Sequence, residues 1–338
     1  MSAWSIVGHT WAVEQLQRAV ARDEVPHALL LTGPEGIGKR TLARTMVAAM
    51  FCETAEATTE SPNPCGECLA CRKLASGNHP DFIVAAPEDR TSNLKIDQIR
   101  EVGRFLSLTP NESRYKVVLI RGFERATTGA ANALLKTLEE PPGYAHLILL
   151  ASNADHLLPT IVSRTQQIHL RPLPRPVIAK ALTDRWDVAQ ERAERLARVS
   201  GGRIGWAVKA ATDPEALETM EAALHMLLDL LSQDLPARFE TAKSLATSKA
   251  ELSETLEYWL TFWRDVLLLQ TDNPGGLTHT ELQETLARLA QQEKLETIMY
   301  VINRLAWAQT ALLANANTQL LVENVLLDLP RQGKRGQS

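Results

Sequence analysis

The chain has 338 residues, of which 45% are hydrophobic and 22% are charged, and its formal net charge is −4. This length indicates about two domains and is also compatible with three smaller ones. The slightly acidic balance excludes a protein-wide basic surface, so any contact with nucleic acid would be local. No apolar run approaches the ~20 residues that span a bilayer, and residues 1–9 lack the charged start and apolar core of a signal peptide. We therefore expect a cytoplasmic protein with no membrane partner.

The first half of the chain alternates between strand and helix patterns. Apolar runs bounded by turn residues predict four strands, at 27–32, 82–86, 116–121 and 147–152. Helical spacing of apolar residues predicts helices at 11–21, 41–50, 96–105 and 130–139. Strands that alternate with helices indicate an α/β fold, in which a parallel sheet is covered on both faces.

The segment Gly33-Pro-Glu-Gly-Ile-Gly-Lys-Arg, directly after the first strand, follows the phosphate-loop pattern G-x-x-x-x-G-K-[ST] except at its last position. In this pattern, backbone amides of the loop around Gly33, Gly36 and Gly38 surround the phosphates, and Lys39 reaches the β- and γ-phosphates. Arg40 occupies the position of the hydroxyl that holds magnesium, and a guanidinium cannot ligate a cation. Nucleotide binding therefore remains open, but the usual metal ligand is missing.

The third strand lacks the acidic residue that a phosphate-loop ATPase needs. In such ATPases an aspartate at the end of this strand helps to hold magnesium. Here the strand ends in Arg121-Gly122, and Glu124 is displaced by two positions. Thr41 has a hydroxyl, but it lies one position late and would need a shifted loop. We therefore predict that this chain does not hydrolyse nucleotide.

All four cysteines of the chain lie within one short segment, at Cys52, Cys65, Cys68 and Cys71. Two successive C-x-x-C steps allow thiolates to converge on one tetrahedral ion, and the residues between Cys52 and Cys65 have the composition of a loop. The spacing predicts a zinc site that is structural, because all four positions are filled by protein. The alternative is a redox pair with two uninvolved cysteines.

Beyond about residue 170 only helix patterns remain. Prolines 172, 174 and 176 mark a boundary, and 177–198 predicts a helix pair that ends at Gly201-Gly202. Long amphipathic stretches follow from 213 to 329, with breaks at Leu235-Pro236 and 273–276. Four large side chains on one helical face are expected to be core: Trp259, Phe262, Trp263 and Val266.

Two segments, 130–142 (AANALLKTLEEPP) and 158–165 (LPTIVSRT), resemble the signature of the clamp-loader subunits of bacterial DNA polymerase III, which belong to the AAA+ superfamily. Residues 6–9 (IVGH) resemble the adenine-side segment of this family, and the four cysteines resemble its inserted zinc module. Residues 315–324 resemble its last collar helix. The resemblance thus reaches both ends of the chain.

This resemblance implies a three-part architecture. A RecA-like AAA+ domain is expected at 1–170, with the zinc module at about 52–71. A helical lid is expected at 171–210, a helical collar that joins subunits into a ring at 211–330, and a flexible tail at 331–338. The collar would make the chain part of a hetero-oligomer.

The resemblance also assigns roles to two arginines. Arg164, between Ser163 and Thr165, corresponds to the arginine finger that acts on the nucleotide of a neighbouring subunit. Thr165 replaces the usual cysteine of this segment. Arg203 resembles the lid arginine that senses nucleotide within its own subunit. Arg40 and the Arg121-Gly122 pair depart from the motor subunits of the family, as one branch of it typically does.

The function implied is that of a non-hydrolysing subunit of a hetero-pentameric clamp loader. Its partners would be the gamma/tau ATPase subunits and the delta subunit, with the sliding clamp contacted indirectly and primer-template DNA reached through the assembly. Zinc would be structural. ATP binding stays open, and hydrolysis by this chain is not expected. Two alternatives remain: an active ATPase motor of the same ring, and a zinc-stabilised DNA-binding module. The cysteine segment carries only Arg72 and Lys73 as cations, balanced by Glu67.

Overall fold

The computed structural model describes residues 4–54, 62–89, 92–314 and 316–331. The chain divides into two compact units, Met1–Asp187 with Gly202–Trp206 and Val188–Gly201 with Ala207–Ser338. The predicted division into AAA+ domain, lid and collar stays a prediction. Most of the predicted 53–64 loop and all but the first residue of the predicted tail lie outside the described residues.

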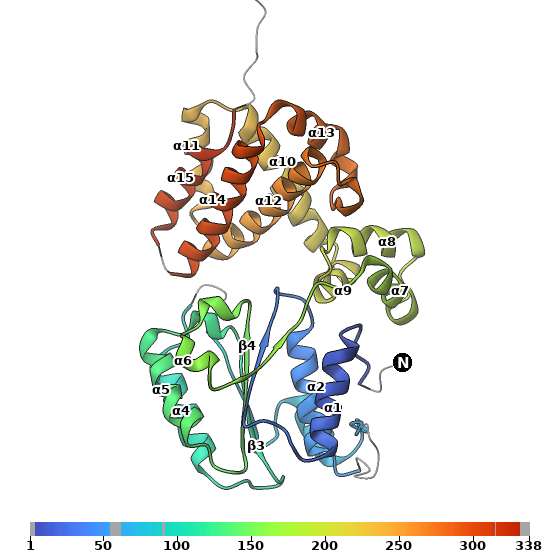
Figure 1. Ribbon diagram of the computed structural model, residues 1–338, viewed down its shortest axis with the longest axis vertical. Coiled ribbons are helices and arrows are strands. Elements are labelled where there is room, and N and C mark those ends of the chain that lie inside the picture. The colour runs from blue at the N-terminus through green and yellow to red at the C-terminus, as the bar shows by residue number, and fades with distance from the viewer. Residues whose placement is uncertain (1–3, 55–61, 90–91, 315, 332–338) are drawn as a thin grey trace, which may run out of the picture. The chain divides into compact units, whose positions relative to one another are not determined.

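The first unit contains a five-stranded sheet in the order β2-β3-β4-β1-β5, in which every pair of neighbours is parallel (Figure 1). Its strands are β1 Ala28–Thr32, β2 Phe82–Ala85, β3 Lys116–Ile120, β4 Ala145–Ala151 and β5 Gln166–His169. The three central strands are buried along their whole length, as expected when helices cover both faces. The parallel α/β sheet is therefore confirmed.

The fifth strand was not predicted from the sequence. Gln166–His169 has one buried residue, Ile168, among three exposed ones. An edge strand of this kind lacks the apolar run that identifies a buried strand, and it forms because its backbone pairs with β1. The four predicted strands are all present, with ends shifted by one or two residues.

Helices cover the two faces of the sheet, with α1 and α2 on one side and α4, α5 and α6 on the other (Figure 1). The helices of this unit are α1 Thr10–Ala21, α2 Lys39–Phe51, α3 Leu69–Ser76, α4 Ile96–Ser107, α5 Thr128–Glu139, α6 Pro159–Val162 and α7 Arg175–Trp186. Successive strand residues serve the two faces in turn: Leu29 and Leu31 pack with α1 and α2, while Leu30 packs with α4 and α5.

The second unit consists of helices. They are α8 Gln190–Val199, α9 Ile204–Thr212 (which begins in the first unit), α10 Glu215–Ser232, α11 Leu235–Leu245, α12 Lys249–Gln270, α13 Gln283–Gln292, α14 Leu295–Leu313 and α15 Thr318–Asp328. The predicted break at Leu235-Pro236 is the start of α11, where Asp234 caps the first turn and Pro236 needs no amide partner. The predicted core residues are confirmed, since Trp259, Phe262, Trp263 and Val266 are fully buried.

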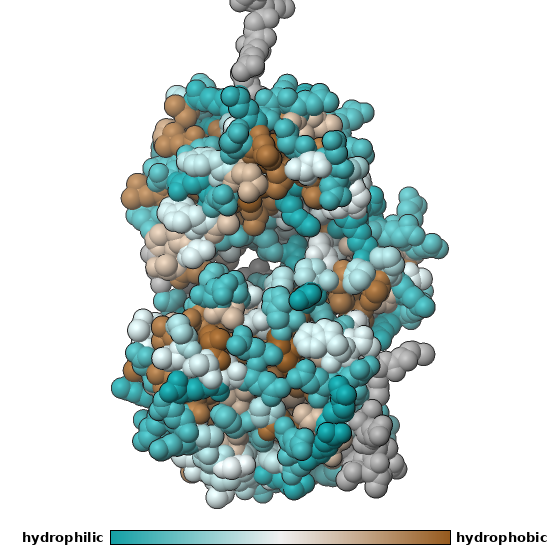
Figure 2. Space-filling model, in the orientation of Figure 1, coloured by the Kyte–Doolittle hydropathy of each residue, from teal (hydrophilic) through white to brown (hydrophobic). Residues whose placement is uncertain are grey.

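The face seen in Figure 2 is mainly hydrophilic, with scattered hydrophobic side chains on both units. On α14 and α15, the large exposed hydrophobic residues are Leu295, Met299, Tyr300, Trp307, Leu320 and Leu327. Within the described residues, every helix is too short or too polar to span a bilayer.

Candidate functional site

The phosphate loop connects β1 to α2 and is built on glycines with positive φ. Gly33, Gly36 and Gly38 have φ values of 140°, 77° and 109°, which glycine adopts without the steric penalty of a Cβ atom. At Gly33 a Cβ atom would also lie only 2.4 Å from the carbonyl oxygen of Leu170. The predicted loop therefore has the backbone form that exposes amide groups to an anion.

Lys39 opens α2 and folds back onto this loop. Its ammonium group donates hydrogen bonds to the carbonyl oxygens of Gly33 and, at 2.9 Å, Pro34. Burial lowers the pKa of Lys39, and the charges of Glu124 and Glu35 oppose this shift. A phosphate would have to compete with the loop carbonyls for the lysine.

The start of α9 packs directly on the same loop. The amide of Gly205 donates to the carbonyl oxygen of Gly36 at 2.6 Å. Arg203 is 8% exposed and lies close to the loop, since a Cβ atom added to Gly36 would be 3.7 Å from the Cβ atom of Arg203. The guanidinium of Arg203 lies 5.9 Å from the ring centroid of Trp206. The predicted lid arginine is thus located beside the phosphate loop of its own chain.

The opening segment also contacts the loop. His9 is buried, and its Nε2 atom lies 3.1 Å from the carbonyl oxygen of Ile37. Burial lowers the pKa of His9, and this hydrogen bond opposes the shift. The ring is therefore neutral, and its Nε2–H group donates the hydrogen bond to the carbonyl oxygen. The segment that resembles the family's adenine side is therefore attached to the phosphate loop.

Two arginines from separate elements occupy the sequence positions at which a phosphate-loop ATPase has its metal ligands, and they lie close enough for the charge of one to act on the other. Arg40 follows the loop lysine on α2, and Arg121 follows the last residue of β3. Burial, the charge of Arg40 and the charge of Arg125 all lower the pKa of Arg121, with Glu35 opposing them. Because Arg40 and Arg121 repel each other, they would also repel a magnesium ion.

The acidic residue next to β3 has an unexpected location. Gly122 begins a short 3-10 helix, Phe123–Arg125, that contains Glu124. The charge of Glu124 acts on Lys39, and one of its carboxylate oxygens is buried without a hydrogen bond among the described residues. Its displacement in sequence therefore does not remove it from the loop lysine. Thr41, by contrast, lies in the first turn of α2 and is exposed.

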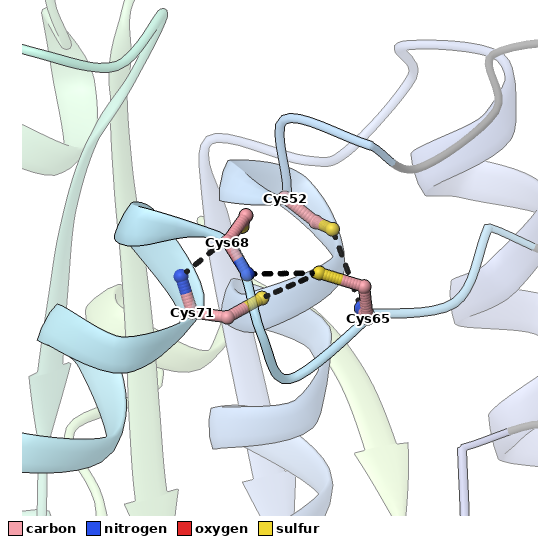
Figure 3. A group of neighbouring side chains, drawn as sticks. All are labelled: Cys52, Cys65, Cys68 and Cys71. Atoms are coloured by element: carbon pink, nitrogen blue, oxygen red, sulfur yellow. Dashed lines mark hydrogen bonds between the residues drawn. The ribbon is translucent and has the colours of Figure 1, made fainter.

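The four cysteines form one cluster, with their sulfur atoms all within 4.8 Å of one another (Figure 3). Cys52 follows the last residue of α2, and Cys68 caps the first turn of α3, in which Cys71 lies. Four sulfurs at about 2.3 Å from one zinc ion lie roughly 3.8 Å apart. The cluster thus needs only small side-chain movements to hold zinc, and four thiolates with no open position fit a structural ion.

Backbone amides around the cluster point at its sulfurs. The amides of Glu67 and Cys68 donate to the Sγ atom of Cys65 at 3.4 and 3.2 Å, and the amide of Cys71 donates to Cys68 at 3.4 Å. The hydroxyl of Thr54, which acts most strongly, and the amides of Cys68 and Glu67 lower the pKa of Cys65 to about 6. Such donors stabilise thiolate ligands from outside the coordination sphere. A redox pair would not need all four sulfurs in contact.

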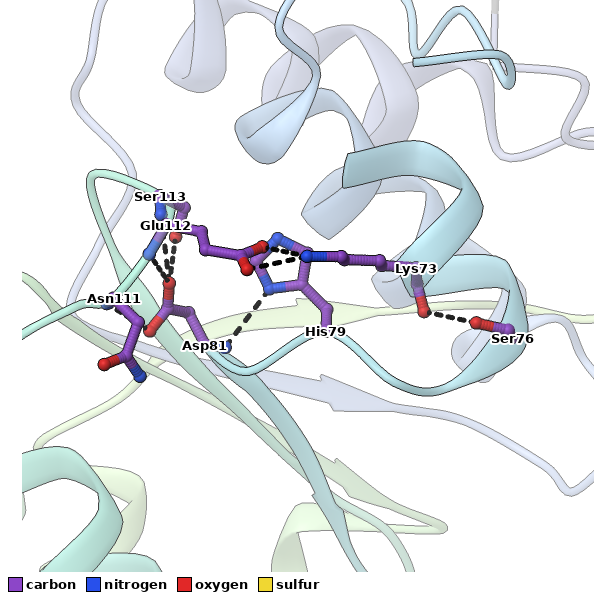
Figure 4. A network of polar contacts seen from close by, with 7 residues as sticks. All are labelled: Lys73, Ser76, His79, Asp81, Asn111, Glu112 and Ser113. Carbon is purple, nitrogen blue, oxygen red and sulfur yellow. Dashed lines mark hydrogen bonds and ion pairs between the residues drawn. The ribbon is translucent and has the colours of Figure 1, made fainter. Parts of the chain in front are cut away.

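A buried ionic network lies beside this cluster and was not predicted from the sequence (Figure 4). Asp81, just before β2, accepts hydrogen bonds from the amides of residues 111, 112 and 113 at 2.8–2.9 Å. The ammonium group of Lys116 lies 3.5 Å from Asp81 and 4.0 Å from the ring centroid of Phe105. On the surface, Lys73 of α3 pairs with Glu112 at 2.6 Å. This network joins the cysteine segment to the loop before β3.

Arg164 lies in the turn after α6 and is partly exposed. Its guanidinium donates to the carbonyl oxygen of Thr160 at 3.1 Å and pairs with Glu139 at 2.8 Å. Its remaining contact among the described residues is with Ser163, so none of its partners belongs to the phosphate loop. The pairing of Arg164 with Glu139 was not predicted from the sequence, although both residues lie in the segments that carry the family resemblance.

The fold and these sites together define a class of protein. A parallel sheet in the order β2-β3-β4-β1-β5, with a phosphate loop after β1 and a second unit made of helices, is the arrangement of a RecA-like AAA+ protein.

Two family models match the chain. One, described as DNA polymerase III, delta subunit, covers residues 8–174, and the other, described as DNA polymerase III, delta subunit, C terminal, covers residues 216–331. The chain belongs to the delta' family of DNA polymerase III clamp-loader subunits.

Individual relatives agree with this assignment. The chain is 39% identical over 199 residues to a DNA polymerase III subunit delta' from Pseudomonas aeruginosa, a match that spans 57% of this chain and 58% of that protein. It is 29% identical over 318 residues to subunit delta' from Bacillus subtilis, covering 93% and 94% of the two chains. It is also 28% identical over 322 residues to subunit tau from B. subtilis, covering 88% of this chain and 56% of that protein.

Proposed function

We propose that this chain is a non-hydrolysing clamp-loader subunit that supplies Arg164 to ATP bound by a neighbouring subunit. Its partners in a hetero-pentameric ring are gamma/tau ATPase subunits and a delta subunit. The ring loads a sliding clamp onto primed DNA in the cytoplasm. Similarity to proteins named delta' and tau supports membership of such an assembly, while the residues of this chain support its particular role.

The observation that carries the proposal is the pair of arginines at the metal position. Arg40 and Arg121 repel each other and any divalent cation there, and Lys39 is engaged with the carbonyl oxygens of its own loop. Hydrolysis needs magnesium to neutralise charge that develops on the phosphates. Arg164 contacts none of these residues and has an exposed guanidinium, which is planar, always charged and suited to a γ-phosphate.

The cysteine cluster has a structural role in this proposal. Cys52, Cys65, Cys68 and Cys71 hold zinc, which joins the end of α2 to the start of α3 and supplies no chemistry to ATP. Arg203 lies beside the loop and would contact any nucleotide that binds there.

The test is the full-length Arg164→Ala chain in a ring reconstituted with its ATPase and delta partners. Turnover at the neighbouring ATP site should fall by on the order of 10³, the size of effect expected from an arginine finger. The ATPase rate stimulated by clamp and DNA reports this loss, and analytical ultracentrifugation confirms that the ring is complete. The matched control is Arg22→Ala, which removes another exposed arginine of the first unit. An unchanged stimulated rate in complete rings would rule out the finger role.

One observation favours the rival function, an active ATPase motor. Glu124 acts electrostatically on Lys39 despite its displacement in the sequence, so a carboxylate is available near the loop. A motor would hydrolyse ATP as a purified chain and lose this activity in Lys39→Ala. We expect no hydrolysis by either chain above the level of a buffer blank.

The cysteine segment has little positive charge with which to bind DNA, as the DNA-binding alternative would require. Of the two cations in the cysteine segment, Arg72 and Lys73, Lys73 is engaged by Glu112. A DNA-binding zinc module would show affinity for primer-template DNA that falls steeply with salt, and we expect no such binding by the isolated chain.

A further inference from the structure

The contact between Arg164 and Glu139 is specific in its geometry. The Nη2 atom of Arg164 lies 2.8 Å from Oε1 of Glu139, while Nη1 donates to the carbonyl oxygen of Thr160. The side chains are 38% and 49% exposed. The guanidinium is therefore held from two sides, yet both groups of the ion pair remain accessible to solvent and to a partner.

The core of the first unit fixes both ends of this pair. Glu139 is the last residue of α5, and Arg164 follows α6, which starts at Pro159. Ile161 of α6 is fully buried in the same hydrophobic cluster as Leu134 and Leu138 of α5. The end of α5 and the turn after α6 are thus held together whether or not the ion pair forms.

A carboxylate at this position is unfavourable for α5 itself. The carboxyl end of a helix carries partial negative charge, which repels acidic side chains. Glu139 closes the helix, and Glu140 follows it directly. The local helix therefore gives no reason for Glu139, and the guanidinium of Arg164 is the group among its described contacts that offsets its charge.

The same carboxylate competes with the role proposed for Arg164. A guanidinium in contact with a carboxylate offers less charge to a second anion, and the carboxylate repels a phosphate brought to the same group. A γ-phosphate carries more charge than a carboxylate and accepts stronger hydrogen bonds. It can therefore displace Glu139, but only when the neighbouring site is correctly positioned.

We propose that Glu139 stores Arg164 in an unreactive position and so restrains ATP hydrolysis in the ring before clamp and DNA are bound. This inference rests on the finger role of Arg164. An exposed ion pair shifts an equilibrium by a factor of about two to five, which is enough to bias the arginine and small enough for assembly to overcome. Glu139 acts through Arg164 and does not itself touch the nucleotide.

The experiment uses the full-length Glu139→Gln chain in the reconstituted ring. Glutamine keeps the size of the side chain and removes its charge. The basal ATPase rate, without clamp and DNA, should rise by roughly two- to fivefold, while the maximal rate with clamp and DNA should stay unchanged. Glu140→Gln is the matched control, because it removes the adjacent acidic charge, and it should leave the basal rate unchanged.

A second arm places Glu139→Gln in the Arg164→Ala background, where the rise should disappear. A basal rate that does not rise in the single variant overturns the proposal. So does a rise that persists without Arg164, because Glu139 would then act by another route. If Arg164→Ala alone leaves the stimulated rate unchanged, the finger role fails and this proposal fails with it. If Arg164→Ala lowers the stimulated rate and Glu139→Gln has no effect, only the storage role fails.

Discussion

At the scale of single residues, charges that lie far apart in the sequence determine what the phosphate loop can do. Arg40 and Arg121 are each unremarkable as surface arginines, but burial and mutual repulsion lower the pKa of Arg121 where the two meet. Lys39 remains, with Glu124 near it. This arrangement is consistent with our prediction that the loop retains groups for phosphate while positive charge occupies the positions of the usual metal ligands.

Asp81 is the residue on which the buried network depends. Burial alone would raise its pKa, but three backbone amides and Lys116 outweigh burial and lower the pKa of Asp81 to about 2. Lys116 is 1% exposed, so loss of Asp81 leaves a buried ammonium group without its counter-charge. Such uncompensated charges are costly.

Asp81→Asn should destabilise the protein by roughly 2–3 kcal/mol at pH 7, since a carboxyl pKa lowered by about two units is worth this much. Because the pKa of Asp81 is lower in the folded state, its ionised carboxylate stabilises the folded state at pH values above the unfolded-state pKa of about 3.9. This stabilisation is lost as the pH falls towards 2. The difference in the free energy of unfolding between wild type and Asp81→Asn should therefore shrink as the pH falls from about 4 to about 2. Urea unfolding at several pH values measures it.

The matched control for this prediction is Asp97→Asn, which removes an exposed carboxylate of α4. It should change stability by less than about 0.5 kcal/mol at any pH. If the difference in unfolding free energy between wild type and Asp81→Asn stays constant down to pH 2, the lowered pKa of Asp81 is contradicted.

At the scale of elements, the cysteine cluster connects two helices that the sequence separates. α2 ends before Cys52, and α3 begins after Cys68, with residues 55–61 between them outside the described part of the chain. A cavity of about 600 Å³ lies along this junction, lined by Arg44 of α2 and by Cys71 and Leu74 of α3, among others. Ala70 and Leu74 of α3 pack in the same hydrophobic cluster as α2, and metal coordination is expected to add to this attachment.

Cys68→Ser should abolish metal binding, because a closed site with three remaining thiolates loses both a ligand and its geometry. The purified wild-type chain should contain about one zinc ion, measured by plasma mass spectrometry, and the variant none. Its thermal midpoint should fall, and a chelator should lower the wild-type midpoint to the same value without affecting the variant. Retention of zinc by Cys68→Ser would exclude the four-thiolate site.

In the second unit, Arg238 connects helices, as the cysteine cluster does in the first unit. It is 2% exposed, lies on α11, and donates hydrogen bonds to the carbonyl oxygens of Leu230, Leu326, Leu329 and Pro330 at 2.8–2.9 Å. These carbonyl groups lie at the carboxyl ends of α10 and α15, where partial negative charge favours a cation. One side chain thus ties three helices together.

At the scale of the whole molecule, the two compact units have separate stabilising groups. Arg238→Leu should cost about 3–5 kcal/mol, because it leaves several buried carbonyl groups without donors. Asp81→Asn should affect the first unit and Arg238→Leu the second. We expect calorimetry to resolve two transitions, each variant lowering a different one, with additive effects in the double variant. A single transition that both variants lower equally would show that the units unfold together.

Much of the fold could be predicted from the sequence because its signals are local. Apolar runs identified β1 to β4, glycine spacing identified the phosphate loop, and cysteine spacing identified the candidate metal ligands. β5 was missed because an exposed edge strand has no periodic apolar pattern. The division into three parts and the roles of Arg164 and Arg203 remain predictions.

The sequence by itself determined the α/β class, the helical second half and the family to which the chain belongs, since each depends on neighbouring residues or on motifs. Only the tertiary structure decided which charges act on each other: Arg40 on Arg121, Asp81 on Lys116, and Arg164 on Glu139. The physical reason is that electrostatic interactions depend on distance in space and on burial, and folding sets both by packing elements that are remote in the chain.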